Sequence, residues 1–112
     1  MIYDIEISEQ AEVDLRNLYL YIAVDLQSPE TGESQLERIK EAIYALDKFP
    51  ERFRLYDEEP WRSLGVRMLV VDNYIVLYVV KEEKDQVTII RVMYNGRDIK
   101  AQLKLDEGNL RI

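Results

Sequence analysis

Residues 66–80 read VRMLVVDNYIVLYVV, two strand-like runs separated by the polar pair Asp72-Asn73. Aliphatic β-branched and aromatic residues favour strands, and Asp and Asn tolerate the positive φ that a two-residue hairpin turn needs. Such a turn places residues whose numbers sum to 145 opposite one another, so that Arg67 pairs with Tyr78. The sequence therefore predicts an antiparallel hairpin of defined register.

The two faces of this hairpin differ in chemistry, because side chains alternate between faces along a strand. The aliphatic face consists of Val66, Met68, Val70, Ile75, Leu77 and Val79. The mixed face consists of Arg67, Leu69, Val71, Tyr74, Val76, Tyr78 and Val80. We expect helices to cover the aliphatic face and a ligand or partner to bind the mixed face.

A third strand follows at residues 87–94, which read VTIIRVMY. If residues 82–85 form a four-residue loop, Tyr78 lies opposite Ile89 and Val76 lies opposite Arg91. This register places Arg67, Tyr78 and Arg91 together on the mixed face. The aliphatic face then gains Thr88, Ile90, Val92 and Tyr94.

The first half of the chain predicts a strand and two helices. Residues 3–7 alternate apolar and polar, which is typical of a short strand. Ser8 is suited to cap a first helix, and Ser28-Pro29 is a start signal for a second. Their apolar stripes are Ala11, Leu15, Leu18, Tyr19, Ile22 and Leu26 in the first helix, and Leu36, Ile39, Ile43 and Leu46 in the second. Together they predict a helical hairpin.

The remaining segments complete an α+β fold in one domain spanning residues 1–112. Residues 49–62 contain two prolines and have neither strand nor helix periodicity, so we expect a connecting loop. Ile99 and Leu103 have the i, i+4 spacing of a short last helix. Residues 104–112 are expected to form a flexible tail.

Composition excludes several kinds of chemistry. The chain has 112 residues with no cysteine and no histidine, so it lacks disulfides, thiolates and the commonest general base and metal ligand. We therefore expect no cofactor and no bound metal. No apolar run is long enough for a membrane span and no signal-peptide pattern begins the chain, so a cytoplasmic location is expected.

Charge is unevenly distributed along the chain. Residues 1–61 hold 15 acidic and 6 basic residues, net −9, whereas residues 62–112 hold 7 acidic and 9 basic residues, net +2. The total of −7 repels phosphate backbones at long range, so we expect no tight binding to naked nucleic acid. Docking on a larger protein or ribonucleoprotein stays open.

Arginines and tyrosines in the strands are the candidate functional residues. Arg67 and Arg91 interrupt apolar strands, so each guanidinium needs an acidic partner, open solvent or a ligand. Tyr74, Tyr78 and Tyr94 suit either packing or binding. The residues alone leave the structural and the functional interpretations open.

The order of strand, helical hairpin, proline-containing loop, three-stranded meander and short helix resembles the RelE/ParE superfamily of bacterial toxins. The resemblance covers residues 1 to about 103 and rests on residues 49–53 (FPERF), 66–67 (VR), 73–78 (NYIVLY) and 90–98 (IRVMYNGRD). It implies the toxin of a type II toxin–antitoxin module, which a cognate antitoxin neutralises. Members of the RelE branch cut mRNA on the ribosome, and members of the ParE branch inhibit DNA gyrase.

The resemblance also implies candidate residues for each branch. For a RelE-like nuclease, the catalytic residues are Arg67, Arg91 and Arg97. For target or antitoxin binding, the candidates are Arg67, Leu69, Tyr74, Tyr78, Arg91, Tyr94 and Arg97. Among these, Arg67 matches a basic position on the second strand, and Arg97 matches the arginine after the last strand.

Departures from the RelE pattern favour the ParE branch. Leu69 stands where that branch has a second lysine, Ile75 or Val76 where it has an arginine, and Leu103 where it has a tyrosine. Losing these groups removes positive charge that stabilises a reacting phosphate. We therefore favour a ParE-like gyrase inhibitor over a RelE-like nuclease acting on ribosome-bound mRNA. A non-toxic module that only binds antitoxin is the third alternative.

Overall fold

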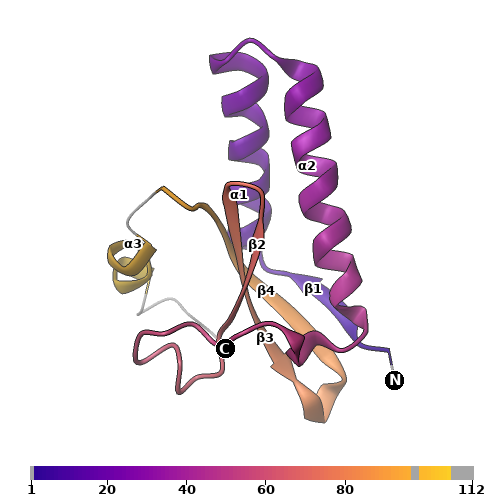
Figure 1. Ribbon diagram of the computed structural model, residues 1–112, viewed down its shortest axis with the longest axis vertical. Coiled ribbons are helices and arrows are strands. Elements are labelled where there is room, and N and C mark those ends of the chain that lie inside the picture. Colours follow the sequence, from indigo (N-terminus) through magenta and orange to yellow (C-terminus); the bar gives the residue numbers. More distant parts are fainter. Residues whose placement is uncertain (1, 97–98, 107–112) are drawn as a thin grey trace.

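The computed structural model describes residues 2–96 and 99–106 (Figure 1). Its elements are β1 (Asp4–Ile7), α1 (Glu9–Leu20), α2 (Pro29–Tyr44), β2 (Arg67–Val71), β3 (Tyr74–Lys81), β4 (Gln86–Tyr94) and α3 (Ile99–Asp106). A π-helical turn, Tyr21–Asp25, extends α1. The expected α+β architecture is confirmed. None of the described helices is long and apolar enough to cross a membrane.

The two long helices begin where the sequence predicts. The Ser8 side chain caps α1 by accepting a hydrogen bond from the Ala11 amide at 3.1 Å. Pro29 occupies the first position of α2, where its missing amide hydrogen costs no hydrogen bond. In Figure 1 the connected ends of the helical hairpin project beyond the sheet. Residues at those ends are therefore free to contact other molecules.

The sheet has the order β1-β4-β3-β2, with β1 parallel to β4 and the other neighbours antiparallel. The predicted β2–β3 register is confirmed, since Arg67 lies opposite Tyr78 and Val71 opposite Tyr74. Asp72 has a φ of 56°, the positive value that the turn was expected to need. The turn chemistry thus determined the register of this hairpin.

A β-bulge changes the predicted register of β3 and β4. Tyr78 lies opposite Ile89 as predicted, so the four-residue loop was counted correctly. The next residue, Leu77, lies opposite Arg91, which leaves Ile90 as an extra residue in β4. The predicted pairing of Val76 with Arg91 is therefore wrong.

The bulge also exchanges the faces of the last residues of β4. Val92, predicted for the aliphatic face, packs with Val76 in the core beneath the helices. Tyr94 stacks against Tyr74, which packs against that same core. One inserted residue moves every later side chain of the strand to the opposite face, because side chains alternate between faces with a period of two.

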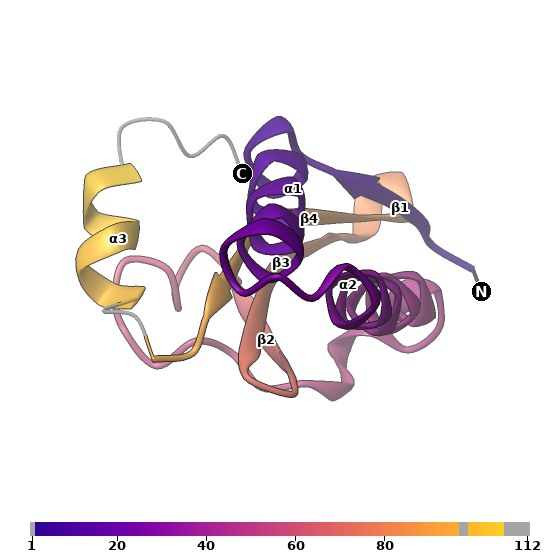
Figure 2. The ribbon, with the colours of Figure 1, turned by 90° about the horizontal axis from the view of Figure 1, so that it is seen from above.

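The helical hairpin covers the mixed face, which corrects the prediction that it would cover the aliphatic face. The core below the helices contains Leu69, Val76 and Tyr78 together with Leu15, Leu18, Ile39 and Ile43. Most of the aliphatic face is covered as well, by Tyr56 and Trp61 of the connecting loop and by Leu103 of α3, whereas Val70 is exposed. Figure 2 shows α3 set apart from the hairpin. Both faces are apolar enough to be buried, so the alternation alone did not decide which one the helices cover.

Candidate functional site

The predicted site residues separate into three groups. The first group, Tyr78 and Arg67, forms hydrogen bonds to the connecting loop. Tyr78 is fully buried, and its hydroxyl donates to the Pro50 carbonyl oxygen at 2.6 Å. Burial raises the pKa of Tyr78 to about 12, against the opposing effect of nearby arginines. The Arg67 guanidinium donates to the carbonyl oxygens of Phe53 at 2.7 Å and Glu51 at 3.2 Å. Both side chains are therefore occupied with anchoring residues 50–53.

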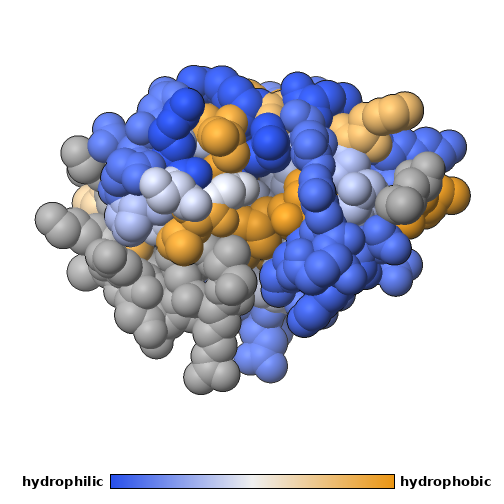
Figure 3. Space-filling model, turned by 90° about the horizontal axis from the view of Figure 1, so that it is seen from below, coloured by the Kyte–Doolittle hydropathy of each residue, from blue (hydrophilic) through white to orange (hydrophobic). Residues whose placement is uncertain are grey.

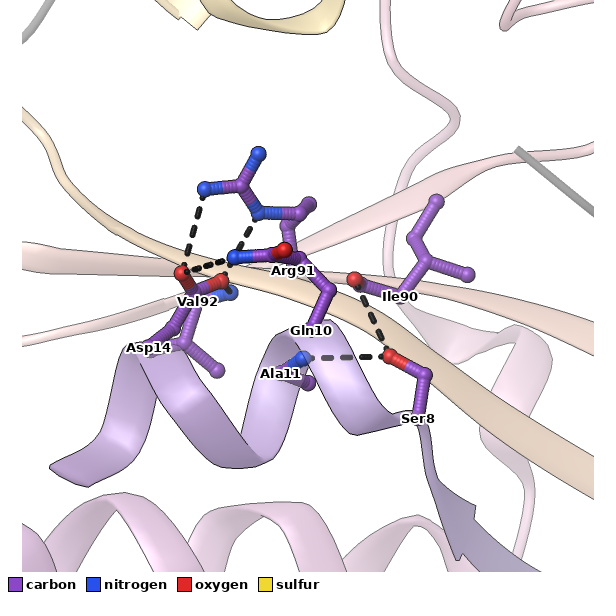
Figure 4. Close-up of polar contacts among 7 residues, drawn as sticks. All are labelled: Ser8, Gln10, Ala11, Asp14, Ile90, Arg91 and Val92. Carbon is purple, nitrogen blue, oxygen red and sulfur yellow. Dashed lines mark hydrogen bonds and ion pairs between the residues drawn. The ribbon is translucent and has the colours of Figure 1, made fainter. Parts of the chain in front are cut away.

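The second group is a buried ion pair between β4 and α1 (Figure 4). β1 ends at Ile7, opposite Ile89, so β4 continues without a neighbouring strand on that edge. The Asp14 carboxylate accepts a hydrogen bond from the Val92 amide at 2.9 Å. It also accepts from Arg91 Nε at 2.8 Å and Nη2 at 3.1 Å. The Arg91 and Asp14 side chains are 5% and 9% exposed, so this arginine is part of the core and not of an open face.

The predicted convergence of arginines on an open sheet face is wrong. Arg67 lies on β2 and Arg91 on β4, with β3 between them in the sheet. Leu69, predicted to bind a partner, is 7% exposed and lies beneath the helices. Arg97 lies outside the described residues. The mixed face is not a binding surface, because its aliphatic residues pack against the helical hairpin and form the core.

The third group is a tyrosine cluster, formed by Tyr21, Tyr74 and Tyr94. Tyr74 begins β3 and Tyr94 ends β4; their rings are 5.8 Å apart between centroids and inclined at 72°. Burial, then the phenols of Tyr94 and Tyr21, raise the pKa of Tyr74. Tyr21 and Tyr94 are 53% and 51% exposed. The cluster therefore lies at the end of the sheet, near the end of α1, and offers two aromatic rings to solvent.

The backbone around the cluster is held from both sides. The Tyr94 ring lies where a side chain at Gly96 would have its first carbon, so only glycine leaves room for it. The Asn95 amide donates to the Asn73 carbonyl oxygen at 2.7 Å. The β2–β3 turn is tied to α2, because Arg38 forms an ion pair with Asp72. These contacts fix the positions from which the rings project.

Exposed apolar side chains continue from the cluster along the projecting end of the helical hairpin. They are Leu20, Val24 and Leu26, at 44%, 63% and 56% exposed. An exposed apolar and aromatic surface is typical of a protein-binding site. The described residues contain no group of three or more acidic residues placed to hold a metal ion. The exposed apolar and aromatic surface therefore favours recognition of a protein.

Tyr21 was not among the predicted site residues, although the sequence carries a signal for it. The predicted apolar stripe of α1 includes Leu18 and Ile22 but leaves Leu20, Tyr21 and Val24 outside it. Apolar residues outside the buried stripe of an amphipathic helix lie on its solvent side. Their clustering at one end indicates a contact surface there.

The sequence of the chain matches a known protein family over most of its length. A model of the ParE toxin of the parDE type II toxin–antitoxin system matches residues 5–99. Among curated proteins, none has significant sequence similarity to the chain.

Solved structures share the fold at low sequence identity. The chromosomal ParDE system of P. aeruginosa matches with a TM-score of 0.68 and 22% identity, covering 83% of this chain and 96% of that one. The RelBE2 toxin–antitoxin complex of Mycobacterium tuberculosis matches with a TM-score of 0.63 and 21% identity, covering 87% and 95%. A mutant of the E. coli toxin RelE in the free state matches with a TM-score of 0.65 and 18% identity, covering 98% and 100%. Both branches of the superfamily therefore share this architecture.

Proposed function

The chain belongs to the ParE toxin family of type II toxin–antitoxin systems, and we propose that it arrests growth by binding DNA gyrase and is neutralised by a cognate antitoxin. The choice of gyrase rests on one observation: the side chains of Arg67 and Arg91 are engaged in contacts within the chain itself. One is bonded to loop carbonyls and the other to Asp14. A phosphate-cleaving site needs such cations turned toward the substrate. A target-binding toxin does not.

The tyrosine cluster is the surface that we assign to gyrase. Tyrosine is enriched at protein interfaces because its ring is apolar and its hydroxyl forms hydrogen bonds. Tyr94 is half exposed and rests against Gly96 and Tyr74. A ring already fixed in place loses little conformational entropy on binding. Tyr94 is therefore the residue from which we expect the largest contribution to affinity.

The antitoxin is proposed to bind along the helical hairpin. The matched ParDE and RelBE2 structures are toxin–antitoxin systems, which supports a cognate antitoxin for this chain. The antitoxin does not have access to the mixed face of the sheet, because Val76 and Ile89 on that face are fully buried beneath the helices. The exposed apolar residues Leu20, Val24 and Leu26 at the end of the hairpin support the alternative.

One experiment distinguishes the candidate functions. The chain is induced in bacteria with and without the product of the adjacent gene, and growth, plasmid supercoiling and mRNA 5′ ends are measured. In parallel, purified chain is added to gyrase supercoiling assays. We expect growth arrest, relaxed plasmids and direct inhibition of gyrase, all relieved by the adjacent gene product. Normal supercoiling during growth arrest would contradict the proposal.

Ribosome-dependent mRNA cleavage is the second candidate function. The similarity to E. coli RelE, which covers 98% of this chain, favours it, and Arg97 retains a position matched in the RelE pattern. It predicts new mRNA 5′ ends that appear only when ribosomes are present, without loss of supercoiling. A chain that binds the adjacent gene product but leaves growth unchanged would instead support a non-toxic binding module.

A further inference from the structure

A surface hollow of about 420 Å³ lies at the end of the molecule opposite the projecting hairpin. We call it the basal hollow; its lining is formed by Tyr3, Phe49, Pro50, Glu51 and Arg52. Figure 3 views this end of the molecule, on which separate apolar patches lie among hydrophilic residues. Neither the growth-arrest proposal nor the tyrosine cluster uses this region.

Phe49 is displayed to solvent by a backbone conformation that phenylalanine rarely adopts. Its φ and ψ are 50° and 53°, in the left-handed region, and the residue is 81% exposed. Left-handed backbone is unfavourable for residues with a β-carbon, and exposure of the ring gives no compensating burial. The Phe49 carbonyl oxygen is held by the Arg52 amide at 3.2 Å and by Arg52 Nη1 at 3.0 Å. The fold therefore maintains an exposed aromatic ring at the rim of the hollow.

The one cation in the lining is already occupied. Arg52 Nη1 also donates to the Lys48 carbonyl oxygen at 2.5 Å, and Nη2 donates to the Ala45 carbonyl oxygen at 3.4 Å. Its guanidinium also lies over the Phe53 ring, 4.7 Å from the centroid. Arg52 thus caps the end of the α2 segment, and its hydrogen bonds go to backbone carbonyl oxygens and not to the acidic side chains of the hollow.

Carboxylates gather beside Tyr3 at the hollow. A hydrogen bond with the Glu51 side chain, followed by its charge, raises the pKa of Glu82. Burial, then the charges of Glu82, Glu51 and Asp85, raise the pKa of Tyr3. Within residues 2–96 and 99–106, none of the recorded ion pairs involves Glu51, Glu82 or Asp85. The hollow therefore places an exposed aromatic ring beside carboxylates that take part in none of these ion pairs.

We propose that the basal hollow binds a basic segment of a partner protein, with an arginine or lysine seated between the Phe49 ring and the carboxylates of Glu51 and Glu82. An aromatic face attracts a cation through its quadrupole, and carboxylates accept charge-assisted hydrogen bonds from it. The acidic character of residues 1–61, net −9, attracts such a segment at long range. This inference goes beyond gyrase binding and does not depend on it, because the tyrosine cluster lies at a different end of the molecule.

The test is an amide NMR titration of the intact chain with a blocked peptide, acetyl-Gly-Arg-Gly-Arg-Gly-amide. Its control is the peptide with both arginines replaced by glutamine. We expect saturable shifts at Tyr3, Phe49, Glu51 and Glu82 with the arginine peptide alone. Equal shifts with both peptides, or shifts spread over all acidic surfaces, would overturn the proposal.

Variants distinguish the site from general charge attraction. Phe49→Asn removes the ring and suits left-handed backbone, so the fold is retained. We expect it, and the pair Glu51→Gln with Glu82→Gln, to weaken peptide binding at least fivefold. The control pair, Glu12→Gln with Glu33→Gln, changes net charge equally on exposed helix positions and should change affinity less than twofold. Equal weakening by the two pairs would show that only net charge matters.

Discussion

The Asp14 carboxylate on α1 binds the Arg91 guanidinium on β4 and also accepts the Val92 amide. β1 ends at Ile7, so the edge of β4 beyond Ile89 has no neighbouring strand. There the Asp14 carboxylate provides the hydrogen-bond acceptor that a neighbouring strand would otherwise provide. The adjacent Ser8 continues this attachment, because its amide donates to the Ile89 carbonyl oxygen at 3.0 Å. The first turns of α1 are thus fixed to the sheet by polar contacts as well as by apolar packing.

We expect loss of Asp14 to destabilise the fold more than loss of Arg91. Asp14→Ala removes the carboxylate that balances a buried guanidinium and that accepts the Val92 amide, which should lower the free energy of unfolding by about 3–5 kcal/mol. Arg91→Met leaves the carboxylate with the Val92 amide and the Gln10 side chain, so we expect a loss of roughly 1–3 kcal/mol. Urea unfolding measures both. An equal or larger loss for Arg91→Met would contradict this assignment of roles.

The Tyr78 hydroxyl makes stability depend on pH in alkaline solution. Its pKa is raised from 10.0 to about 12 in the folded chain. The unfolded chain therefore loses this proton first as pH rises, and the stabilisation is complete below pH 10 and lost between about pH 10 and 12. Tyr78→Phe also lacks the hydrogen bond to Pro50, which is worth about 1 kcal/mol. We expect its stability difference from the native chain to shrink as pH rises through this range.

Denaturant unfolding at a series of pH values measures that difference, and absorbance of ionised tyrosine reports when the proton is lost. A difference between Tyr78→Phe and the native chain that stays constant from pH 9 to 12 would show that burial does not hold the proton. Tyr44→Phe is the matched control, because Tyr44 is exposed on α2.

The fold was predictable from sequence where local chemistry decides structure. Asp72-Asn73 determines the β2–β3 register, and Ser8 and Pro29 determine where the long helices begin. The bulge at Ile90 was not predictable, because a run of apolar residues accommodates an extra residue without a polar signal. Which face the helices cover also depends on packing of the whole chain, since both faces bury aliphatic side chains.

The candidate site was only partly predictable for a related reason. Tyr94 and Tyr74 were named as binding residues, and the structure brings them together. Arg91 was misassigned because its acidic partner lies 77 residues away in the sequence. A signal existed, since Asp14 lies three residues after Ala11 and four before Leu18, on the buried side of α1. An acidic residue on a buried helix face and an arginine in an apolar strand together indicate an ion pair.

Arg97 stays a prediction from the family resemblance, because it lies outside the described residues. Its guanidinium can hold a phosphate or a carboxylate in a bidentate manner that lysine does not reproduce. We expect Arg97→Ala to abolish growth arrest while shifting the melting midpoint little, and Arg97→Lys to restore only part of the activity. A fully toxic Arg97→Ala variant would show that this side chain does not contact the target.

Relief of strain at Phe49 should stabilise the fold. Glycine accepts left-handed backbone without steric cost, so we expect Phe49→Gly to raise the free energy of unfolding by roughly 0.5–1.5 kcal/mol despite the loss of the ring. Thermal and urea unfolding measure the change. The comparison variant is Phe49→Ala, which keeps a β-carbon and should not be stabilised. If both variants lower stability equally, the ring itself contributes to packing and the basal hollow is less exposed than described.

The position of the Tyr94 ring can be tested separately from its presence. Tyr94→Ala removes the ring and should weaken gyrase inhibition at least tenfold, about 1.4 kcal/mol or more, as expected for an aromatic residue central to an interface. Gly96→Ala keeps the ring but displaces it, because the new methyl group occupies the space where the ring lies. We expect a similar loss from both variants. Growth inhibition and supercoiling assays measure activity, and thermal unfolding verifies that the variants are folded.

Tyr44→Ala is the matched control for these two variants, since Tyr44 is 53% exposed at the far end of α2. It should retain full activity. Retained activity in Gly96→Ala together with loss in Tyr94→Ala would mean that the phenol acts wherever it lies, so rigidity is unimportant. Retained activity in both variants would remove the tyrosine cluster from the target interface. Loss of activity in all three would point to a general effect of removing surface groups, because Tyr44 and Tyr94 share exposure and residue type but not location.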